Sequence, residues 1–498
     1  MPTDSKPRLP KGVGRIVFIL LGANFVAFLN ETVLGVALPK LMRDLNISAS
    51  TGQWLTTAFL LTMAVIIPVT GYLQSRHSTR NLFMLAMITF IVGTTIAALS
   101  GSFVMLLIGR VLQAAGTALL MPMFMTTLMK IVPENMRGAL MGQVSLVFAV
   151  APALGPAASG LIVQAWGWHA LFWVVLPIAL AALVVGSRWL HLEHEPGPAR
   201  LDLPSLVLTV LGFSTLIYGL SEVGTAVRGE AAFNPVFAIL PGAALVVWFV
   251  LRQLKLGKTN SALLDLATFR SRAFRNALTL MSVLLFSLYG VIIVVPIYTQ
   301  NVLHQTALAT GLMMMPGGLL QGLVGGFAGK LYDKVGAPRI LIPALSAFTL
   351  GIFLMTFFDQ NTPMWQVFIA FSIISGALGF AFPVMFSVSM SSLGAELYSH
   401  GSATIGVSQQ VSGAAGTAGF VAVLTMLSGV TTAASSPEQL NAGTHGAFLA
   451  GAVFAVVALV ISLRVRPDAQ PASPEVPAQV ESASAESASA ELTSVTAE

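Results

Sequence analysis

The positions of the basic residues limit the possible folds of this chain more than any other feature. Of its 25 Lys and Arg, only Arg110 lies inside one of the long apolar segments that recur along the chain. Each segment has about 20 residues, enough to cross a hydrocarbon core of roughly 30 Å as a helix. Backbone groups in lipid must bond internally, and runs of this length favour helices over the shorter strands of a barrel. The sequence therefore predicts an all-α polytopic membrane protein.

The composition supports this class and excludes others. Charged residues make up 9% of the chain and hydrophobic residues 55%, whereas about 25% of an ordinary soluble domain is charged. The net charge is +5, but the basic residues are scattered through short gaps, so we expect no nucleic-acid partner. The chain has no Cys and its His residues lack ligand spacing. We therefore expect no disulfide, no metal and no cofactor.

About fourteen spans meet this length criterion. With the N-terminus inside, only Lys40, Arg43 and Arg228 fall in outer gaps, and the 21 other Lys and Arg apart from Arg110 lie in inner segments or at the inner ends of spans. This distribution follows the positive-inside rule and predicts that both termini are cytoplasmic. No cleavable h-region precedes the first span, so we expect that span to be retained. The expected spans are 15–38, 52–73, 82–100, 103–128, 138–163, 169–190, 203–221, 234–253, 274–299, 308–330, 339–358, 365–390, 402–428 and 446–465.

Two inner segments differ from the other gaps. The segment from Lys255 to Arg275 mixes Leu and Phe with basic residues. It either lies on the inner membrane surface or forms a solvated linker. Beyond Arg466 the chain turns to Pro, Ser, Ala and Glu without a basic residue, so 466–498 is expected to be a disordered acidic cytoplasmic tail.

Two ionisable residues lie at bilayer depth, Glu31 in the first span and Arg110 in the fourth. Glu31 lies about 22–24 Å along its span from Arg15, and Arg110 about 12 Å from the outer end of its own, so their depths are similar. An ionised group there is costly unless it is paired or faces water, so we expect the two to meet, directly or through water. Helix periodicity places Asn24 on the face of Glu31 and Gln113 on the face of Arg110.

Two interpretations of this pair remain. In the functional one, Glu31 binds and releases a proton while Arg110 tunes its proton affinity. In the structural one, a fixed ion pair only locks two helices. Ionisable groups inside a membrane are functional by default, which favours the first.

Other side chains are candidates for a substrate cavity. The Gln residues within the spans, Gln143 among them, either bond between helices or face a substrate. Tyr289 and the many Met suit an adaptable apolar pocket or an ordinary core. The candidate cavity residues are Asn24, Gln113, Tyr289, Gln321, Gln409 and Gln410.

A weak internal repeat and a glycine-rich segment complete the pattern. GYLQSRHSTR, from Gly71 to Arg80, follows the second span, and GKLYDKVGAPR, from Gly329 to Arg339, follows the tenth. Corresponding loops of this kind are typical of internally repeated transporters. The fifth span contains APALGPAASG, from Ala151 to Gly160, and glycines recur at four-residue spacing in the tenth, so these helices are expected to pack closely. The functional interpretation is that they form the contact on which two halves rock.

At these residues the chain resembles the major facilitator superfamily, and within it the fourteen-helix drug:proton antiporter family, over roughly 15–465. Each motif alone is moderately specific, and together, in order and on the right helices, they are strong. GKLYDKVG matches the loop motif, LLIGRVLQAAG the fourth-helix motif, ALGPAASG the antiporter motif and LNETVLGVALP the first-helix motif. The matching residues are Gly329, Asp333, Lys334 and Gly336; Gly71, Arg76 and Arg80; Arg110, Gln113 and Gly116; Ala151, Gly155, Pro156 and Gly160; and Leu29, Thr32, Ala37, Leu38 and Pro39.

The chain departs from the family patterns at several positions. The family's first-helix Asp falls on Asn30, which leaves the carboxylate on Glu31, about 100° around the helix. In the first loop motif Ser75 replaces Asp and Ser78 replaces Gly, so Asp333 is expected to hold the loop interaction alone. Ser159 replaces a Gly of the antiporter motif, and Ala114 one of the fourth-helix motif.

The resemblance implies the major facilitator fold, with two six-helix bundles and two additional transmembrane helices. The implied parts are a cytoplasmic N-terminal segment at 1–14, bundles at 15–190 and 274–465, extra helices at 203–253, and a cytoplasmic loop at 254–273, followed by the tail. It also implies that Glu31, Arg110 and Asn30 take part in proton coupling, and that Pro156 and its neighbours shape the conformational change.

We therefore expect a proton-coupled exporter of hydrophobic, cationic drugs in a bacterial cytoplasmic membrane, acting as a monomer with protons, hydrophobic small molecules and the lipid bilayer as partners. The alternatives are a narrow-substrate exporter of an endogenous metabolite or lipid, a nutrient importer, and a membrane sensor. An importer of polar solutes needs more polar cavity residues, and a sensor needs a folded soluble domain. An enzyme needs a catalytic constellation, which the sequence lacks.

Overall fold

Fourteen long α-helices account for most of the chain in a computed structural model. The structure describes residues 12–47, 49–190, 192, 202–227, 229, 231, 233–259, 262–428 and 437–465. Within these ranges there is no strand. The helices are α1 Val13–Asp44, α2 Ala49–Arg76, α3 Thr79–Ala98, α4 Phe103–Ile131, α5 Glu134–Trp166, α6 His169–Trp189, α7 Leu203–Val227, α8 Val236–Leu256, α9 Arg272–Ile297, α10 Ala307–Val335, α11 Ala337–Met355, α12 Met364–Ser391, α13 Tyr398–Ser428 and α14 Pro437–Ser462.

The predicted class is confirmed. Thirteen of these helices are long and apolar enough to cross a membrane. The remaining one, α5, is 33 residues long, and some of its side chains lie outside the described residues. Boundaries differ from the expected spans most at three ends, because α1 continues to Asp44, α7 continues to Val227, and α14 begins at Pro437 rather than near 446.

Local side-chain caps explain where several helices begin. Ser102 accepts a hydrogen bond from the N–H of Met105 (3.3 Å) at the start of α4, and Ser271 accepts one from Phe274 (3.0 Å) at the start of α9. Each cap satisfies one of the backbone N–H groups that a helix leaves unpaired at its first turn. The cap at Ser102 fixes the start of α4, and so places Arg110 two turns into the helix.

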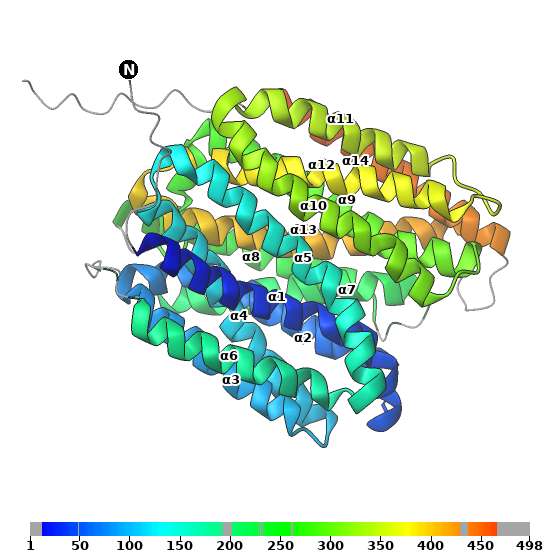
Figure 1. Cartoon of the computed structure of the whole chain (residues 1–498), viewed down its shortest axis with the longest axis horizontal. Coiled ribbons are helices and arrows are strands. Elements are labelled where there is room, and N and C mark those ends of the chain that lie inside the picture. The colour runs from blue at the N-terminus through cyan, green and yellow to red at the C-terminus, as the bar shows by residue number, and fades with distance from the viewer. Residues whose placement is uncertain are drawn as a thin grey trace, which may run out of the picture. The chain divides into compact units, whose positions relative to one another are not determined.

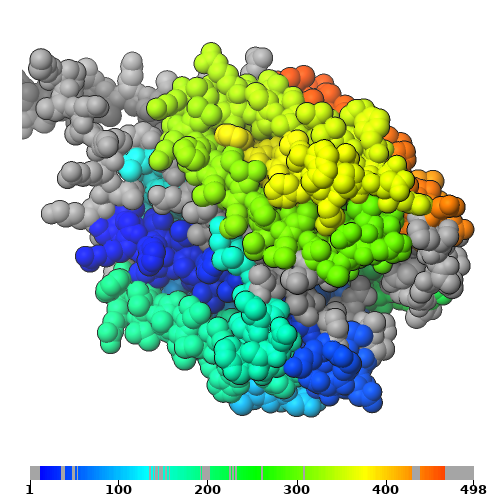
Figure 2. All heavy atoms as spheres, turned by 45° about the vertical axis from the view of Figure 1, so that its right-hand side comes forward, coloured from blue at the N-terminus to red at the C-terminus, as the bar shows by residue number. Residues whose placement is uncertain are grey.

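The helices form two groups of six with a hairpin beside them (Figure 1). Helices α1–α6 pack on one another, as do α9–α14, and the two groups meet where α5 runs beside α10 and where α13 contacts α2 and α4. The hairpin of α7 and α8 joins both groups, because α7 packs on α2 and on α13. Figure 2 shows the C-terminal group, green to orange, against the blue and teal N-terminal group. We propose 15–190 and 274–465 as the limits of the two bundles.

The loop between α8 and α9 corrects one expectation. Leu263 and Leu264 are 1% and 5% exposed, and their N–H groups donate to Oε1 of the buried Gln253 at 2.8 and 3.2 Å. This part of the loop therefore packs into the protein, and neither a membrane-surface segment nor a solvated linker describes it. The reason is that Gln253 satisfies the backbone donors that burial would otherwise leave unpaired. The tail, 466–498, and residues 1–11 lie outside the described residues.

Candidate functional site

Arg110 is the only charged side chain in the buried core of the described residues, at 1% exposure. One guanidinium nitrogen, Nη1, donates to the backbone oxygen of Asn30 (3.4 Å) and to Oε1 of Gln113 (3.1 Å). Its Cζ lies 4.2 Å from the ring centre of Phe59 on α2, within the range of a cation–π contact. Arg110 thus joins α1, α2 and α4 at one depth.

A buried amide network surrounds this cation. Gln113 donates from Nε2 to Thr94 on α3 (2.9 Å) and to Oδ1 of Asn30 on α1 (3.4 Å), and both Asn30 and Gln113 are fully buried. Two donors in this cluster, Nδ2 of Asn30 and Nε of Arg110, have no hydrogen-bond partner among the described residues. The side chains that bond to Arg110 in this network are therefore uncharged, and two of its hydrogen-bond donors have no partner among the described residues.

Glu31 does not complete this network. Its carboxylate makes no ion pair with Arg110 among the described residues, although the two interact electrostatically at longer range. The direct form of the expected contact is therefore not seen, because Asn30 occupies the face of α1 that meets α4 and the next residue points about 100° away. A contact through water stays a prediction. Glu31 keeps accessible surface and lies within electrostatic range of the Tyr289 phenol on α9.

Tyr289 brings the C-terminal half close to Glu31. It is 41% exposed, and its ring lies against α13, where a Cβ at Gly413 would be 3.3 Å from the nearest ring atoms. Gln409 lies one helical turn before Gly413 and so on the same face of α13. Gln409 and Gln410 are half-buried.

The other proposed cavity residues are less accessible in this conformation. Asn24 is 1% exposed and donates to the Leu20 carbonyl of its own helix at 2.8 Å. Gln113 belongs to the buried network. Gln321 on α10 is half-buried, and its backbone packs against Gly379 of α12. Gln143 falls on a part of α5 whose side chains are outside the described residues.

The antiporter-motif segment of α5 lies directly against α1. Gly155 leaves room for Thr32, because a Cβ there would overlap the threonine hydroxyl. Ser159 donates from Oγ to the Val33 carbonyl at 2.6 Å. Ala151 is buried and Gly160 is half-buried, while the side chain of Pro156 is outside the described residues. The substitution of Ser159 for Gly thus adds a bond two residues from Glu31, which the sequence pattern alone did not indicate.

The two halves also meet where α4 ends and α13 begins. The hydroxyls of Thr126 and Ser402 are 2.9 Å apart, and Nη1 of Arg137 donates to the Tyr398 hydroxyl at 3.4 Å. The described conformation is therefore closed at this end, which the charge distribution predicts to be cytoplasmic. Sequence reasoning missed all four residues, because nothing in their local patterns links positions so far apart in the chain.

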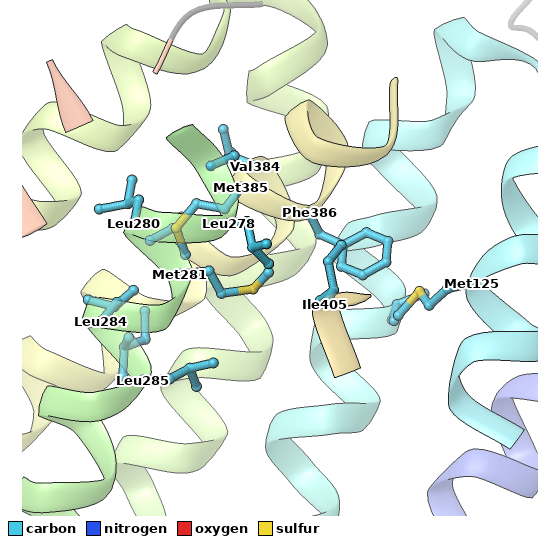
Figure 3. Packing of buried hydrophobic residues seen from close by; sticks show 14 of the residues in the cluster. Met125, Leu278, Leu280, Met281, Leu284, Leu285, Val384, Met385, Phe386 and Ile405 are labelled. Atoms are coloured by element: carbon cyan, nitrogen blue, oxygen red, sulfur yellow. The ribbon is translucent and has the colours of Figure 1, made fainter. Parts of the chain in front are cut away.

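Apolar side chains continue this closure toward the centre of the helices. Figure 3 shows Met125 of α4 beside Ile405 of α13 and Phe386 of α12. All three are buried and belong to one hydrophobic cluster. Met is an adaptable side chain that fills irregular gaps, so Met125 can pack against both the aromatic ring and the branched side chain of the other half.

Comparison with known proteins identifies the family. The sequence model of the Major Facilitator Superfamily matches residues 20–417. The chain belongs to this superfamily. It is 35% identical to the lincomycin resistance protein LmrB of Listeria monocytogenes over 460 residues, which cover 91% of this chain and 96% of that protein. It is 29% identical to a multidrug resistance protein B homolog of Mycobacterium tuberculosis, covering 84% of this chain and 77% of the relative.

A solved structure shows the same facilitator fold. The human organic anion transporter MFSD10 superposes with a TM-score of 0.65 at 14% identity, covering 91% of this chain and 100% of that one. At this identity the likeness concerns the fold alone. Together with the family match, the relatives establish a transporter rather than an enzyme.

The first loop motif of this facilitator packs against the other half. Gly71 near the end of α2 faces His400 of α13, where a Cβ would lie 2.9 Å from Nδ1. The same Nδ1 accepts a hydrogen bond from the N–H of Asp265 at 3.2 Å. His400 therefore joins α2, α13 and the loop after α8. Arg76 and Arg80, at the end of α2 and the start of α3, both make further contacts.

The two loop motifs turn in different ways. Gly336 has a φ of +79° between α10 and α11, which only glycine adopts without strain. Ser78, at the equivalent place, has a φ of −60° and caps α3 through the N–H of Asn81 at 3.3 Å. Ser75, where an Asp is usual, donates to the Tyr72 carbonyl of its own helix. In the second copy Gly329 is buried, and Asp333 and Lys334 are exposed at the end of α10.

Proposed function

We propose that this facilitator exports hydrophobic, cationic drugs or antibiotics in exchange for protons, as a monomer in a bacterial cytoplasmic membrane. One observation carries the proposal. Glu31 is a carboxylate within a membrane-spanning helix that keeps accessible surface, makes no ion pair among the described residues, and has a buried cation nearby. Ionisable groups at such positions mark ion pathways and proton relays.

The relatives support the substrate class. Proteins named for lincomycin and multidrug resistance match this chain over most of their length. The side chains near Glu31 suit such compounds, since Tyr289 offers an exposed aromatic face and Gln409 and Gln410 offer amides. Apolar walls with a few polar groups are typical of small-molecule sites, and a carboxylate there favours cations.

Exchange follows if protonation and drug binding compete at Glu31. A proton entering down the membrane potential releases about 2.3 kcal/mol per 100 mV, and each ligand shifts the balance between two access states by its differential affinity. The closed contacts of Thr126 with Ser402 and of Met125 with Phe386 and Ile405 then describe one of these states. The other state requires these contacts to separate.

The test is transport into everted membrane vesicles, with a panel of cationic and neutral antibiotics that includes lincomycin. We expect accumulation of several hydrophobic cations, abolished by a protonophore. Vesicles without the protein are the control. Accumulation that survives the protonophore would contradict proton coupling.

The names of the 35%-identical relatives also favour a second candidate, an exporter restricted to one antibiotic class. Accumulation of lincomycin alone from the panel would favour this narrower function. Both candidates share the proton-coupled mechanism, so the panel decides the substrate range and the protonophore decides the coupling.

A further inference from the structure

A groove lies on the C-terminal half, away from Glu31 and Arg110. Its volume is about 860 Å³, and its walls come from α10, α11 and α12. Figure 1 shows α12 between α10 and α11, and Figure 2 shows these helices, in light green and yellow, at the surface of the molecule. A groove of this volume falls within the range of small-molecule sites, roughly 300–1,000 Å³.

The walls of the groove are apolar and accessible. Leu323 of α10 is 60% exposed and Ile369 of α12 is 43% exposed, and both line the groove. All three helices are long and apolar enough to span a membrane, so this surface meets hydrocarbon rather than water. The lining residues of α10 run from Pro316 to Leu331, which is about 22 Å along the helix. That length exceeds one leaflet of a core roughly 30 Å thick.

One end of the groove carries its only charged lining residue, Arg339. Arg339 lies in the first turn of α11, is exposed, and makes no ion pair among the described residues. The charge distribution predicts this end to be cytoplasmic, at the level of the lipid headgroups. Lys330, Asp333 and Lys334 are also exposed at the end of α10, so the local charge is net positive.

A planar guanidinium beside an apolar groove selects a particular kind of ligand. Arg binds phosphate through two parallel N–H donors, and basic pockets between membrane helices on the cytoplasmic side bind anionic lipid headgroups. A cationic drug matches the walls but is repelled by Arg339 and the two lysines. The ligand that fits both the apolar walls and the basic end of the groove is an amphiphile with an anionic phosphate and a long hydrocarbon chain.

We propose that this groove binds an anionic phospholipid of the cytoplasmic leaflet, with its phosphate on Arg339 and an acyl chain along α10 and α12. This site is separate from the proposed drug and proton site and does not depend on the transport proposal.

Native mass spectrometry of the full chain in detergent tests the site. The protein is incubated with phosphatidylglycerol or with phosphatidylcholine of the same acyl chains. We expect one phosphatidylglycerol to remain bound under conditions that strip phosphatidylcholine. Arg339→Gln should weaken that binding about tenfold, as expected for loss of a charge-assisted hydrogen bond.

Two further variants separate the headgroup from the chain. Arg270→Gln removes another exposed arginine of the same predicted membrane side that does not line the groove, and it should retain the lipid. Ser372→Trp places a bulky side chain in the groove and should displace the lipid while Arg339 is intact, with thermal unfolding confirming that the protein is folded. Equal retention of both lipids, or equal effects of Arg339→Gln and Arg270→Gln, would show ordinary annular lipid only. Displacement of the bound lipid by a cationic drug, with Arg339→Gln improving drug binding, would make the groove a drug route and overturn the assignment.

Discussion

The two six-helix halves share one packing scheme. Gly93 is the fifteenth residue of α3, and a Cβ there would lie 2.7 Å from the carbonyl oxygen of Gly109 on α4. Gly351 is the fifteenth residue of α11, and a Cβ there would lie 3.1 Å from the carbonyl oxygen of Ala370 on α12. Gly109 and Ala370 are both the seventh residues of their helices. The same close approach of two helices is therefore built twice.

The side chains at equivalent positions of this packing scheme differ between the halves. Arg110 is the eighth residue of α4, and its counterpart on α12 is Phe371, which is 7% exposed. Where the N-terminal half has the polar network, the C-terminal half has an apolar cluster. Residues at the same position counted from the start of equivalent helices are Gln113 and Ile374, Thr94 and Ile352, and Asn30 and Tyr289, with the N-terminal residue named first in each pair. The comparison teaches that the proposed proton chemistry belongs to one half, while the other contributes apolar and aromatic surface.

The largest expected effect is the loss of the carboxylate. Glu31→Gln should reduce proton-driven efflux in vesicles to the level of empty membranes, because an amide of the same shape cannot take up a proton. Tyr289→Ala, which removes the exposed aromatic face of the C-terminal half, should weaken the apparent affinity for drugs while the protonophore still abolishes transport.

The control for Glu31→Gln is Glu222→Gln, which removes a carboxylate from α7 in the hairpin beside the two halves. This variant should transport normally. Full proton-driven efflux by Glu31→Gln would remove Glu31 from the mechanism and with it the functional contrast between the halves.

The second prediction moves the carboxylate onto the polar network. Asn30→Asp places a carboxylate where Oδ1 of Asn30 accepts from Nε2 of Gln113, the side chain that also binds Arg110. It also removes Nδ2 of Asn30, which has no partner among the described residues. A hydrogen bond to a charged group contributes about 1.5–3 kcal/mol. We therefore expect a higher unfolding temperature in detergent, and in the Glu31→Gln background a partial return of proton-driven efflux.

Arg110→Gln isolates this interaction through a double-mutant cycle. The gain from Asn30→Asp should disappear when Arg110 is absent. A gain that persists would mean that the new carboxylate acts through other neighbours, and that Arg110 serves only packing.

Sequence alone predicted the helices but not their rotation. Hydropathy located the spans, and the loop motifs revealed the repeat at Gly71 and Gly329. Whether Asn30 or Glu31 faces Arg110 depends on how α1 is turned, and one residue changes the direction by about 100°. That rotation is set by tertiary contacts, such as the bond from Ser159 to the Val33 carbonyl, which no local pattern encodes.

Contacts between distant segments were equally hidden. Thr126 and Ser402 are 276 residues apart and meet only in the folded chain. Leu263 is apolar, which is compatible with a membrane surface, and only the nearby Gln253 oxygen explains its burial. The sequence did not predict the repeated packing at Gly93 and Gly351, because the residues around the two glycines differ.

The third prediction perturbs the contact between the halves at the loop motif. Gly71→Ala brings a methyl group within 2.9 Å of Nδ1 of His400, and overpacking of this kind costs about 1 kcal/mol where a side chain can shift. We expect the ratio of the closed to the open state to fall about fivefold. The chain has no Cys, so a Thr126→Cys/Ser402→Cys pair reports closure by its disulfide yield.

The matched control is Gly326→Ala on α10, where a Cβ meets nothing within 4 Å. It should leave the cross-linking yield unchanged. Equal cross-linking yields in Gly71→Ala and the parent would show that the His400 side chain shifts at no energetic cost. The first loop motif would then not hold the halves together.

The smallest effect is expected in the hairpin that joins the two halves. Asp202, just before α7, accepts hydrogen bonds from Nε and Nη2 of Arg252 on α8 at 2.7 and 2.8 Å, and this bonding holds the pKa of Asp202 well below its usual range. A carboxyl with a lowered pKa in the folded state stabilises the fold above its ordinary pKa of about 3.9, and this contribution falls as the pH drops below that value. Because the arginine side chain is 33% exposed, Asp202→Asn should cost only about 0.5 kcal/mol at neutral pH. Unfolding temperatures of the variant and parent should therefore differ by a constant amount from pH 7 down to about 4 and draw together only at lower pH. A difference that stays constant below about pH 4 would assign the cost to packing.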